Sequence, residues 1–279
     1  MAPVELAAGE RRFTVHRWTA SRLLERGISE ELADAHRRAA CYWRWWFVAR
    51  GHSINDLLES RHHHHQAGDL EEATLVTEWV CSQLDTWGAY RREEQLIHEL
   101  LGWLPERSAK AAAFFHQLGI VAQARGTYDE ALDYYRRSLQ IKEELSNRSG
   151  MAISYHQLGM VTQARGAYDE ALGYYRRSLQ ISEELGNRSG MASTLSQIGV
   201  LFTQQGEAAE AVPLNLRSLA IRSQIGSPEG RIDLYWLGRQ REQLGDERFR
   251  AILSEHLDAE SLAAVWGMLE SVPSTDQAE

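Results

Sequence analysis

The 279-residue chain is poor in the residues on which several large classes of protein depend. It has two lysines, two cysteines and five prolines, and no apolar run is long enough to cross a bilayer. Lys110 is followed by Ala and Lys142 by Glu, whereas a phosphate-binding loop ends in Lys followed by Ser or Thr. We therefore expect no nucleotide hydrolysis by this chain and no membrane partner.

Charge and cysteine spacing exclude further classes. The net charge of −9 argues against nucleic acid as a partner, because phosphate contacts need concentrated Lys and Arg. Cys41 and Cys81 lack metal-type spacing, and residues 1–10 show no secretory signal, so we expect reduced cysteines and a cytoplasmic location. Motifs of serine hydrolases and zinc proteases are also missing. The sequence predicts no enzyme and no cofactor.

What the chain does have is an internal repeat. Residues 111–150 recur as residues 151–190 with about 30 of 40 positions identical, and again, more diverged, as residues 191–230. A fixed period of this length indicates one supersecondary unit that has been duplicated and stacked. Stacked units form extended surfaces, and such surfaces bind partners.

Each copy predicts two helices. In the second copy the first helix ends at Gly166, and Asp169 and Glu170 then lie in the first turn of the next helix, where negative charge is favoured. In the first copy Thr127 and Glu130 have the spacing of a capping box. Every copy is therefore expected to form an antiparallel hairpin.

The residues at the helix contacts resemble the tetratricopeptide repeat family, in its longer, 40-residue variant. That family's pattern is a large residue, Leu-Gly, a small residue, an aromatic residue and a second small residue. In the second copy these positions are Tyr155, Leu158, Gly159, Ala171, Tyr175 and Ser178. The resemblance covers nearly half of the chain and implies an all-α fold, a right-handed α-solenoid of antiparallel helix hairpins. Glycine and alanine allow close approach of the helices, and the aromatic residue fills the gap.

The third copy departs from this pattern. Asn215 stands where the first two copies have a tyrosine, and Pro213 interrupts the predicted second helix. We therefore expect looser packing in residues 191–230.

The repeats divide the chain into five parts. The predicted parts are a strand and helix at 1–27, degenerate Trp-rich hairpins at 28–106, three repeats at 107–230, a degenerate repeat with capping helices at 231–272, and a disordered tail at 273–279. Helical patterns in the second part fall at about 30–50, 54–66, 69–86 and 90–104. Its tryptophans are interpreted as core residues rather than as a ligand cage.

Residues 12–24 resemble the end of the winged-helix subdomain that precedes a helical sensor arm in STAND-type signalling NTPases. The run from Val15 through Trp43 and residues 78–84 into the repeats is similar to that arm. This resemblance implies the sensor or interaction arm of a bacterial signalling or defence regulator, with an NTPase or effector domain as a partner. A stand-alone regulator that senses a short peptide remains an alternative.

In the family that the repeats resemble, the first helix of each hairpin lines a concave groove that holds a protein or peptide. Carried over, the candidate binding residues are His116, Ile120, Gln123, His156, Met160, Gln163, Ser196 and Thr203. Histidine and glutamine side chains at matching height can hydrogen-bond a peptide backbone. The competing interpretation is that His116 and His156 recur only because the duplication is recent.

A metal site at the histidine run 62–65 is a third hypothesis. Successive residues of a helix point about 100° apart, so only His62 and His65 share a face, where Glu59 can join them. The simpler interpretation is that these histidines end a helix before Gly68. On this interpretation the chain holds no metal.

Overall fold

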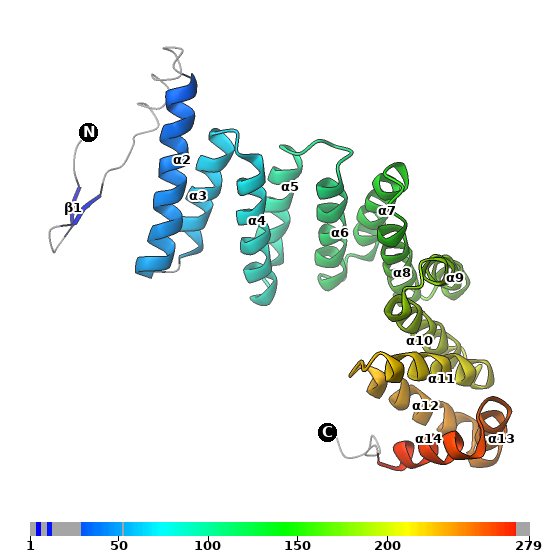
Figure 1. Cartoon of the computed structure of the whole chain (residues 1–279). Coiled ribbons are helices and arrows are strands. Elements are labelled where there is room, and N and C mark those ends of the chain that lie inside the picture. Colours follow the sequence, from blue (N-terminus) through cyan, green and yellow to red (C-terminus); the bar gives the residue numbers. More distant parts are fainter. Residues whose placement is uncertain (1–3, 7–9, 13–28, 52, 272–279) are drawn as a thin grey trace. The chain divides into compact units, whose positions relative to one another are not determined.

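The computed structural model describes residues 4–6, 10–12, 29–51 and 53–271, which are almost entirely helical (Figure 1). The exception is an antiparallel strand pair, β1 (Val4–Leu6) with β2 (Glu10–Arg12). The helix expected after Arg12 and the tail at 273–279 lie outside the described residues. The chain divides into two compact units, Met1–Pro105 and Glu106–Glu279, and each is described by itself.

The helices of the first unit lie close to the ranges that periodicity predicts. They are α2 (Ser29–Trp46), its π-helical continuation η1 (Phe47–Gly51), α3 (Ile54–Gln66), α4 (Leu70–Thr86) and α5 (Tyr90–Leu101). Each helix packs against the next, and the hydroxyl of Ser60 on α3 donates to the carbonyl of Ala40 on α2 at 3.0 Å. These helices are therefore arranged as successive hairpins.

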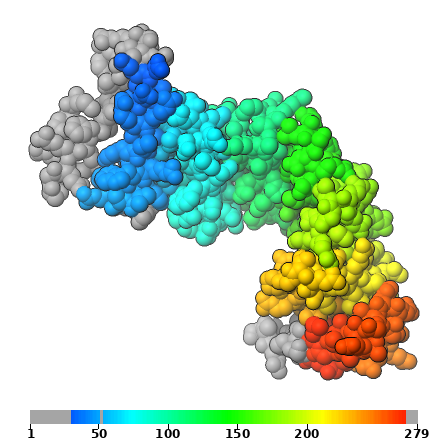
Figure 2. All heavy atoms as spheres, in the orientation of Figure 1, coloured from blue at the N-terminus to red at the C-terminus, as the bar shows by residue number. Residues whose placement is uncertain are grey.

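In the second unit each repeat copy forms one hairpin, as the sequence predicts. The hairpins are α6 (Ala109–Ala124) with α7 (Tyr128–Glu144), α8 (Arg148–Ala164) with α9 (Tyr168–Glu184), and α10 (Arg188–Gln204) with α11 (Ala208–Gln224). The unit ends with α12 (Gly230–Leu244), α13 (Asp246–His256) and α14 (Ala259–Ser271). Successive elements from α6 to α14 form one continuous packed body (Figure 2).

Small residues hold the two helices of each hairpin together. A Cβ atom added to Gly159 would lie 2.6 Å from the ring of Tyr175, so only glycine permits this contact. The buried hydroxyl of Ser178 donates to the carbonyl of Ala152 at 2.8 Å. The same serine bond recurs in the other copies and in the α2–α3 hairpin, at Ser138, Ser218 and Ser60.

The turns between helices confirm the glycine positions but not the predicted cap at Thr127. Gly126 and Gly166 adopt φ values of +76° and +78°, the left-handed region that favours glycine. The Thr127 side chain makes no capping bond and instead donates from its hydroxyl to the carbonyl of Ala122 at 3.1 Å. The capping-box prediction was wrong because the Thr127 hydroxyl is directed to the Ala122 carbonyl, which also accepts the Thr127 backbone N–H at 2.9 Å.

The expectation of looser packing in the third copy was also wrong. α11 continues through Pro213 without a break. Asn215 is fully buried, and an added Cβ on Gly199 would lie 2.2 Å from its Oδ1, as close as the tyrosine contacts of the other copies. Polar packing has replaced aromatic packing at this position without opening the hairpin.

Candidate functional site

The first helices of the repeats follow one another in a layer, in which α6 and α8 share a core cluster that also includes α7. α8 contacts α10 and α10 contacts α12, in addition to the contacts that each makes with its own hairpin partner. The candidate binding residues lie on this layer, at equivalent positions 40 residues apart. We call its surface over α6, α8 and α10 the inner face.

The two predicted histidines are largely engaged inside the protein. The ring of His116 tilts against Tyr135 with 5.2 Å between centroids, and that of His156 lies 5.7 Å from Tyr175. Nδ1 of His156 is 3.2 Å from the Thr194 hydroxyl, whereas the buried Nδ1 of His116 has no hydrogen-bond partner. Burial lowers the pKa of both imidazoles to about 4, so both rings are uncharged at neutral pH.

Glutamine side chains link one copy to the next. The hydroxyl of Tyr175 donates to Oε1 of Gln163 at 2.7 Å, and Nε2 of Gln163 donates to Oε1 of Gln204 at 2.8 Å. In the first copy Tyr135 donates to Oε1 of Gln123 at 3.2 Å. Both amide ends of Gln163 are therefore occupied, and its first role is to hold two first helices in register.

The remaining candidates differ in accessibility. Ile120 and Met160 are half-buried, with one side packed on the apolar core. Ser196 is 2% exposed and Thr203 is 3% exposed, and Thr203 accepts a hydrogen bond from Nε2 of Gln240 at 2.9 Å. Ser196 and Thr203 therefore offer no side-chain surface to a partner, because α12 covers this part of the third copy.

Further residues of this layer are accessible, and two of them, Ala113 and Ile153, lie at inward positions of the repeat pattern. Ile153 is 49% exposed, Ala113 and Gln204 are also exposed, and on α12 Ile232 and Tyr235 expose apolar surface. Gln204 could not be found from the repeat pattern, because it lies one residue beyond the inward position of its copy. Ile232 and Tyr235 could not be found either, because the repeat shortens by one residue between Gly199 and Gly238.

A family model described as tetratricopeptide repeat matches residues 110–184 and 150–224. Residues 110–224 of this chain are tetratricopeptide repeats. No curated protein sequence matches the chain. The repeats of this family are generally protein-interaction scaffolds, and tetratricopeptide proteins bind protein or peptide partners.

Solved structures show the same fold. BtubC (BKLC) from P. vanneervenii is 17% identical with a TM-score of 0.55, over 90% of this chain and 96% of that chain. A putative kinesin light chain of Podosopora anserina with nearly identical TPR-like repeats is 18% identical with a TM-score of 0.46, over 78% and 97%. MamA protein is 15% identical with a TM-score of 0.47, over 70% and 93%. At 17% identity, the similarity to BtubC shows a shared all-α repeat fold and nothing more.

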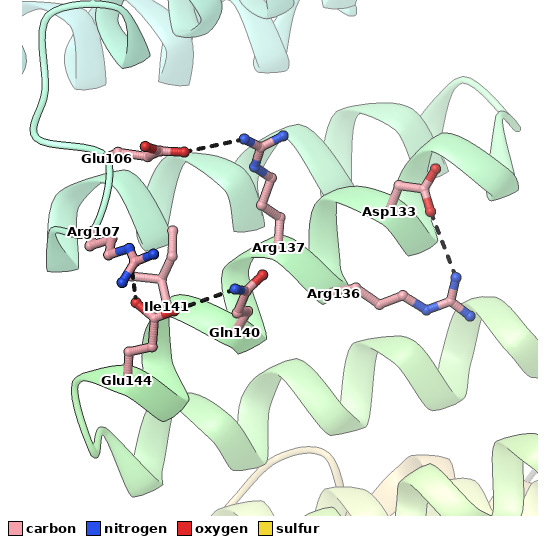
Figure 3. A pocket seen from close by; sticks show the side chains of 8 residues that line it. All are labelled: Glu106, Arg107, Asp133, Arg136, Arg137, Gln140, Ile141 and Glu144. Carbon is pink, nitrogen blue, oxygen red and sulfur yellow. Dashed lines mark hydrogen bonds and ion pairs between the residues drawn. The ribbon is translucent and has the colours of Figure 1, made fainter.

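The first copy also has a charged cleft, which is lined by side chains of its second helix, α7, and of the segment before α6. Figure 3 shows Arg137 directed toward Glu106 and Arg107 toward Glu144, with N···O distances of 3.6 Å and 3.4 Å. Arg136 pairs in the same way with Asp133. Each guanidinium in the cleft therefore has a carboxylate partner, and the cleft is a solvated network of ion pairs.

The histidine run of the first unit does not converge on one point. His62 is exposed, while His65 stacks on Trp103 with 3.7 Å between ring centroids. His63 faces His36, with 2.8 Å between their Nδ1 atoms, and His64 lies near Asp69. Within the described residues no group of three or more His, Cys, Asp or Glu side chains is placed to hold a metal ion. His62 and His65 therefore lack a third ligand.

No described helix is both long and apolar enough to span a membrane. Cys81 is buried, and burial raises the pKa of its thiol to about 12, while Cys41 is an exposed free thiol. The raised pKa of Cys81 is the opposite of the lowered pKa that a nucleophilic thiol uses.

Proposed function

We propose that the chain is a non-enzymatic scaffold that binds a protein or peptide segment along the inner face. The observation that carries this proposal is a set of first helices, linked by a shared core cluster and by direct contacts, whose accessible side chains include apolar ones at equivalent positions, with Ile153 49% exposed. Exposed apolar side chains on a layer of this kind gain free energy when a partner covers them. On this proposal the inner face is the binding site, with Ile120, Met160 and the free amide ends of the glutamines as contacts.

A pair of charge-matched variants tests the proposal. Ala113→Glu with Ile153→Glu places two carboxylates on exposed inner positions, and Gly173→Glu with Ala220→Glu places two on exposed second-helix positions. A Cβ on Gly173 would meet no atom within 4 Å, so the control is not expected to disturb packing. Proteins captured from native lysate by the wild type and the control, but not by the inner-face variant, would support the proposal. Equal capture by all three proteins would contradict it.

We propose further that this scaffold is the interaction arm of a cytoplasmic signalling or defence regulator that works with an NTPase or effector domain. The exposed aromatic side chains near the end of α2 favour this second proposal, since Trp45 is 54% exposed and Tyr42 is 43% exposed. An exposed aromatic surface on the first described helix suits a docked domain. A stand-alone peptide sensor has no second domain to cover this aromatic surface.

The two proposals separate in the same capture experiment. Trp45→Glu should release an NTPase or effector partner while leaving inner-face partners bound. Retention of every partner by this variant would favour the stand-alone regulator.

A further inference from the structure

Beyond the first turn of each helix, α6, α8 and α10 contribute no formal charge to the inner face. Residues 111–124, 149–164 and 189–205 contain no Asp, Glu, Lys or Arg, although these residues make up 25% of the whole chain. Burial keeps His116 and His156 uncharged at neutral pH, as their lowered pKa values show. The surface that the proposed function assigns to a partner is therefore a neutral strip.

Charged residues begin where the strip ends: Lys110 and Arg125 flank its first segment, and three arginines beside the other two segments are engaged within the protein. Arg148, at the start of α8, pairs with Glu184, and Arg188, at the start of α10, donates a hydrogen bond to Gln224. Arg165, which follows α8, lies 3.0 Å from a carboxylate oxygen of Asp129. These basic side chains are therefore not placed to neutralise an acidic partner lying along the middle of the strip.

The strip still offers directed polar groups. Gln123 and Gln204 each use Oε1 to accept a bond from a neighbouring side chain, and among the described residues their amide nitrogens donate none. A primary amide nitrogen carries two N–H donors. Backbone carbonyls of an extended peptide are acceptors that suit these donors, whereas a Lys or Arg side chain is a donor and finds no carboxylate here.

Resting on the proposed function, we infer that the inner face selects an extended peptide segment whose central residues are uncharged. Gln123 and Gln204 donate to the carbonyls of that segment, and Ile153, Ile120 and Met160 contact its apolar side chains. A charged side chain in the centre of the segment loses its hydration without gaining an opposite charge, so its binding is disfavoured. The partner class is a neutral segment of a protein, in contrast to an acidic or basic tail.

A random 12-residue peptide library displayed on phage tests this inference on the full chain. Clones that bind the wild type and the Gly173→Glu, Ala220→Glu control, but not the Ala113→Glu, Ile153→Glu variant, are inner-face ligands. We expect their central positions to be depleted in Asp, Glu, Lys and Arg. In synthetic copies of such a clone, one central Glu or Lys should weaken binding about tenfold or more, and added NaCl should leave the affinity of the neutral peptide nearly unchanged.

The outcomes distinguish this inference from the proposed function. Inner-face ligands with charged centres and strongly salt-dependent affinity would overturn the neutral-segment inference and leave the scaffold function standing. No inner-face ligand at all would count against both. As a positive control, Ala113→Lys with Ile153→Lys should shift the selected peptides toward acidic centres, provided that circular dichroism shows the variant to be folded.

Discussion

Two junctions between neighbouring hairpins are built on the same positions with different chemistry. Between the second and third copies, the Thr194 hydroxyl lies 3.3 Å from that of Ser178 and 3.2 Å from Nδ1 of His156. Between the third copy and α12, Asp233 is fully buried and accepts hydrogen bonds from Arg222 at 2.9 Å and Ser218 at 3.0 Å. Asp233 stands in α12 where Thr194 stands in α10, so one neutral contact has become a buried ion pair.

The buried residue that faces this junction from the preceding second helix also differs from copy to copy. Lys142, Ser182 and Arg222 are equivalent residues of α7, α9 and α11, and all three are buried. Nζ of Lys142 donates to the Ser154 hydroxyl at 2.8 Å, so the first junction is intermediate in chemistry between the other two. The comparison teaches that the repeat fold fixes the geometry of the junction while its polarity is free to change.

The largest effect is expected from breaking the ionic junction. Asp233→Ala leaves the guanidinium of Arg222, a residue 4% exposed, with the Glu229 backbone carbonyl at 3.2 Å and the rim carboxylate of Glu229 at 3.3 Å. Removing one member of a buried pair strands the other charge, so we expect the free energy of unfolding to fall by about 3–5 kcal/mol. Guanidinium chloride denaturation followed by circular dichroism measures this loss.

A double variant sharpens that result. Arg222→Ser with Asp233→Thr installs the residues of the neutral junction, Ser182 and Thr194, and strands no charge. It should therefore be more stable than Asp233→Ala alone. If the double variant is as unstable as Asp233→Ala, the ion pair contributes more free energy than its burial costs. The residues of the two junctions are then not interchangeable.

The next largest loss of stability is expected inside the hairpins of the first and second copies, where a glycine packs against a tyrosine ring. Gly159→Ala forces a methyl group against the buried ring of Tyr175, where the added Cβ would lie 2.6 Å from a ring carbon. We expect a loss of about 2–3 kcal/mol, because overpacking shifts a rigid neighbour. The control is Gly173→Ala on the exposed side of α9, which has open space and should gain about 0.5–1 kcal/mol from helix propensity. If Gly159→Ala leaves the free energy of unfolding unchanged, the Tyr175 ring moves aside without cost.

The lysine junction should respond to pH in a way that the other junctions do not. Burial lowers the pKa of Lys142 to about 8, below its value of about 10.4 in an unfolded chain. Between these values the unfolded chain binds more protons, so the free energy of unfolding rises with pH, by about 2 kcal/mol from pH 7 to pH 10. Lys142→Met lacks this group and should lack this rise. If the free energy of unfolding varies with pH in the same way in the wild type and in Lys142→Met, then Lys142 is protonated in the folded state at pH 10.

The contacts inside a hairpin were predictable from the sequence, whereas those between hairpins were not. Gly159 and Tyr175 lie at fixed offsets of the repeat pattern, and the structure brings them together. The burial of Thr203 depends on Gln240, which follows a change of the repeat period that local patterns do not reveal. Asn215 was read as a defect, because its bonds to Asp233 and Gln240 come from another hairpin.

The same limit applies to the candidate site. The family pattern identified the helices that form the inner face, but it could not tell which side chains would remain accessible. His156 and Gln163 are engaged by Thr194 and Gln204 of the next copy. Conversely, the absence of charge over residues 111–124, 149–164 and 189–205 was visible in the sequence, yet it acquired meaning only once these segments formed one layer.

The smallest expected effect lies in the turn that leads into the second copy. Ser146 has φ of 54°, whereas the equivalent Gly186 and Gly226 adopt φ of 64° and 67° in the later turns. A left-handed conformation costs a residue with a Cβ about 1 kcal/mol more than glycine, so Ser146→Gly should stabilise the chain by roughly that amount. The greater freedom of glycine in the unfolded chain offsets part of this gain. The denaturation midpoints of the wild type and Ser146→Gly measure the net change. A lower midpoint for Ser146→Gly would mean that the added freedom of the unfolded chain costs more than the relieved strain gains. The serine turn would then be as stable as the glycine turns that follow it.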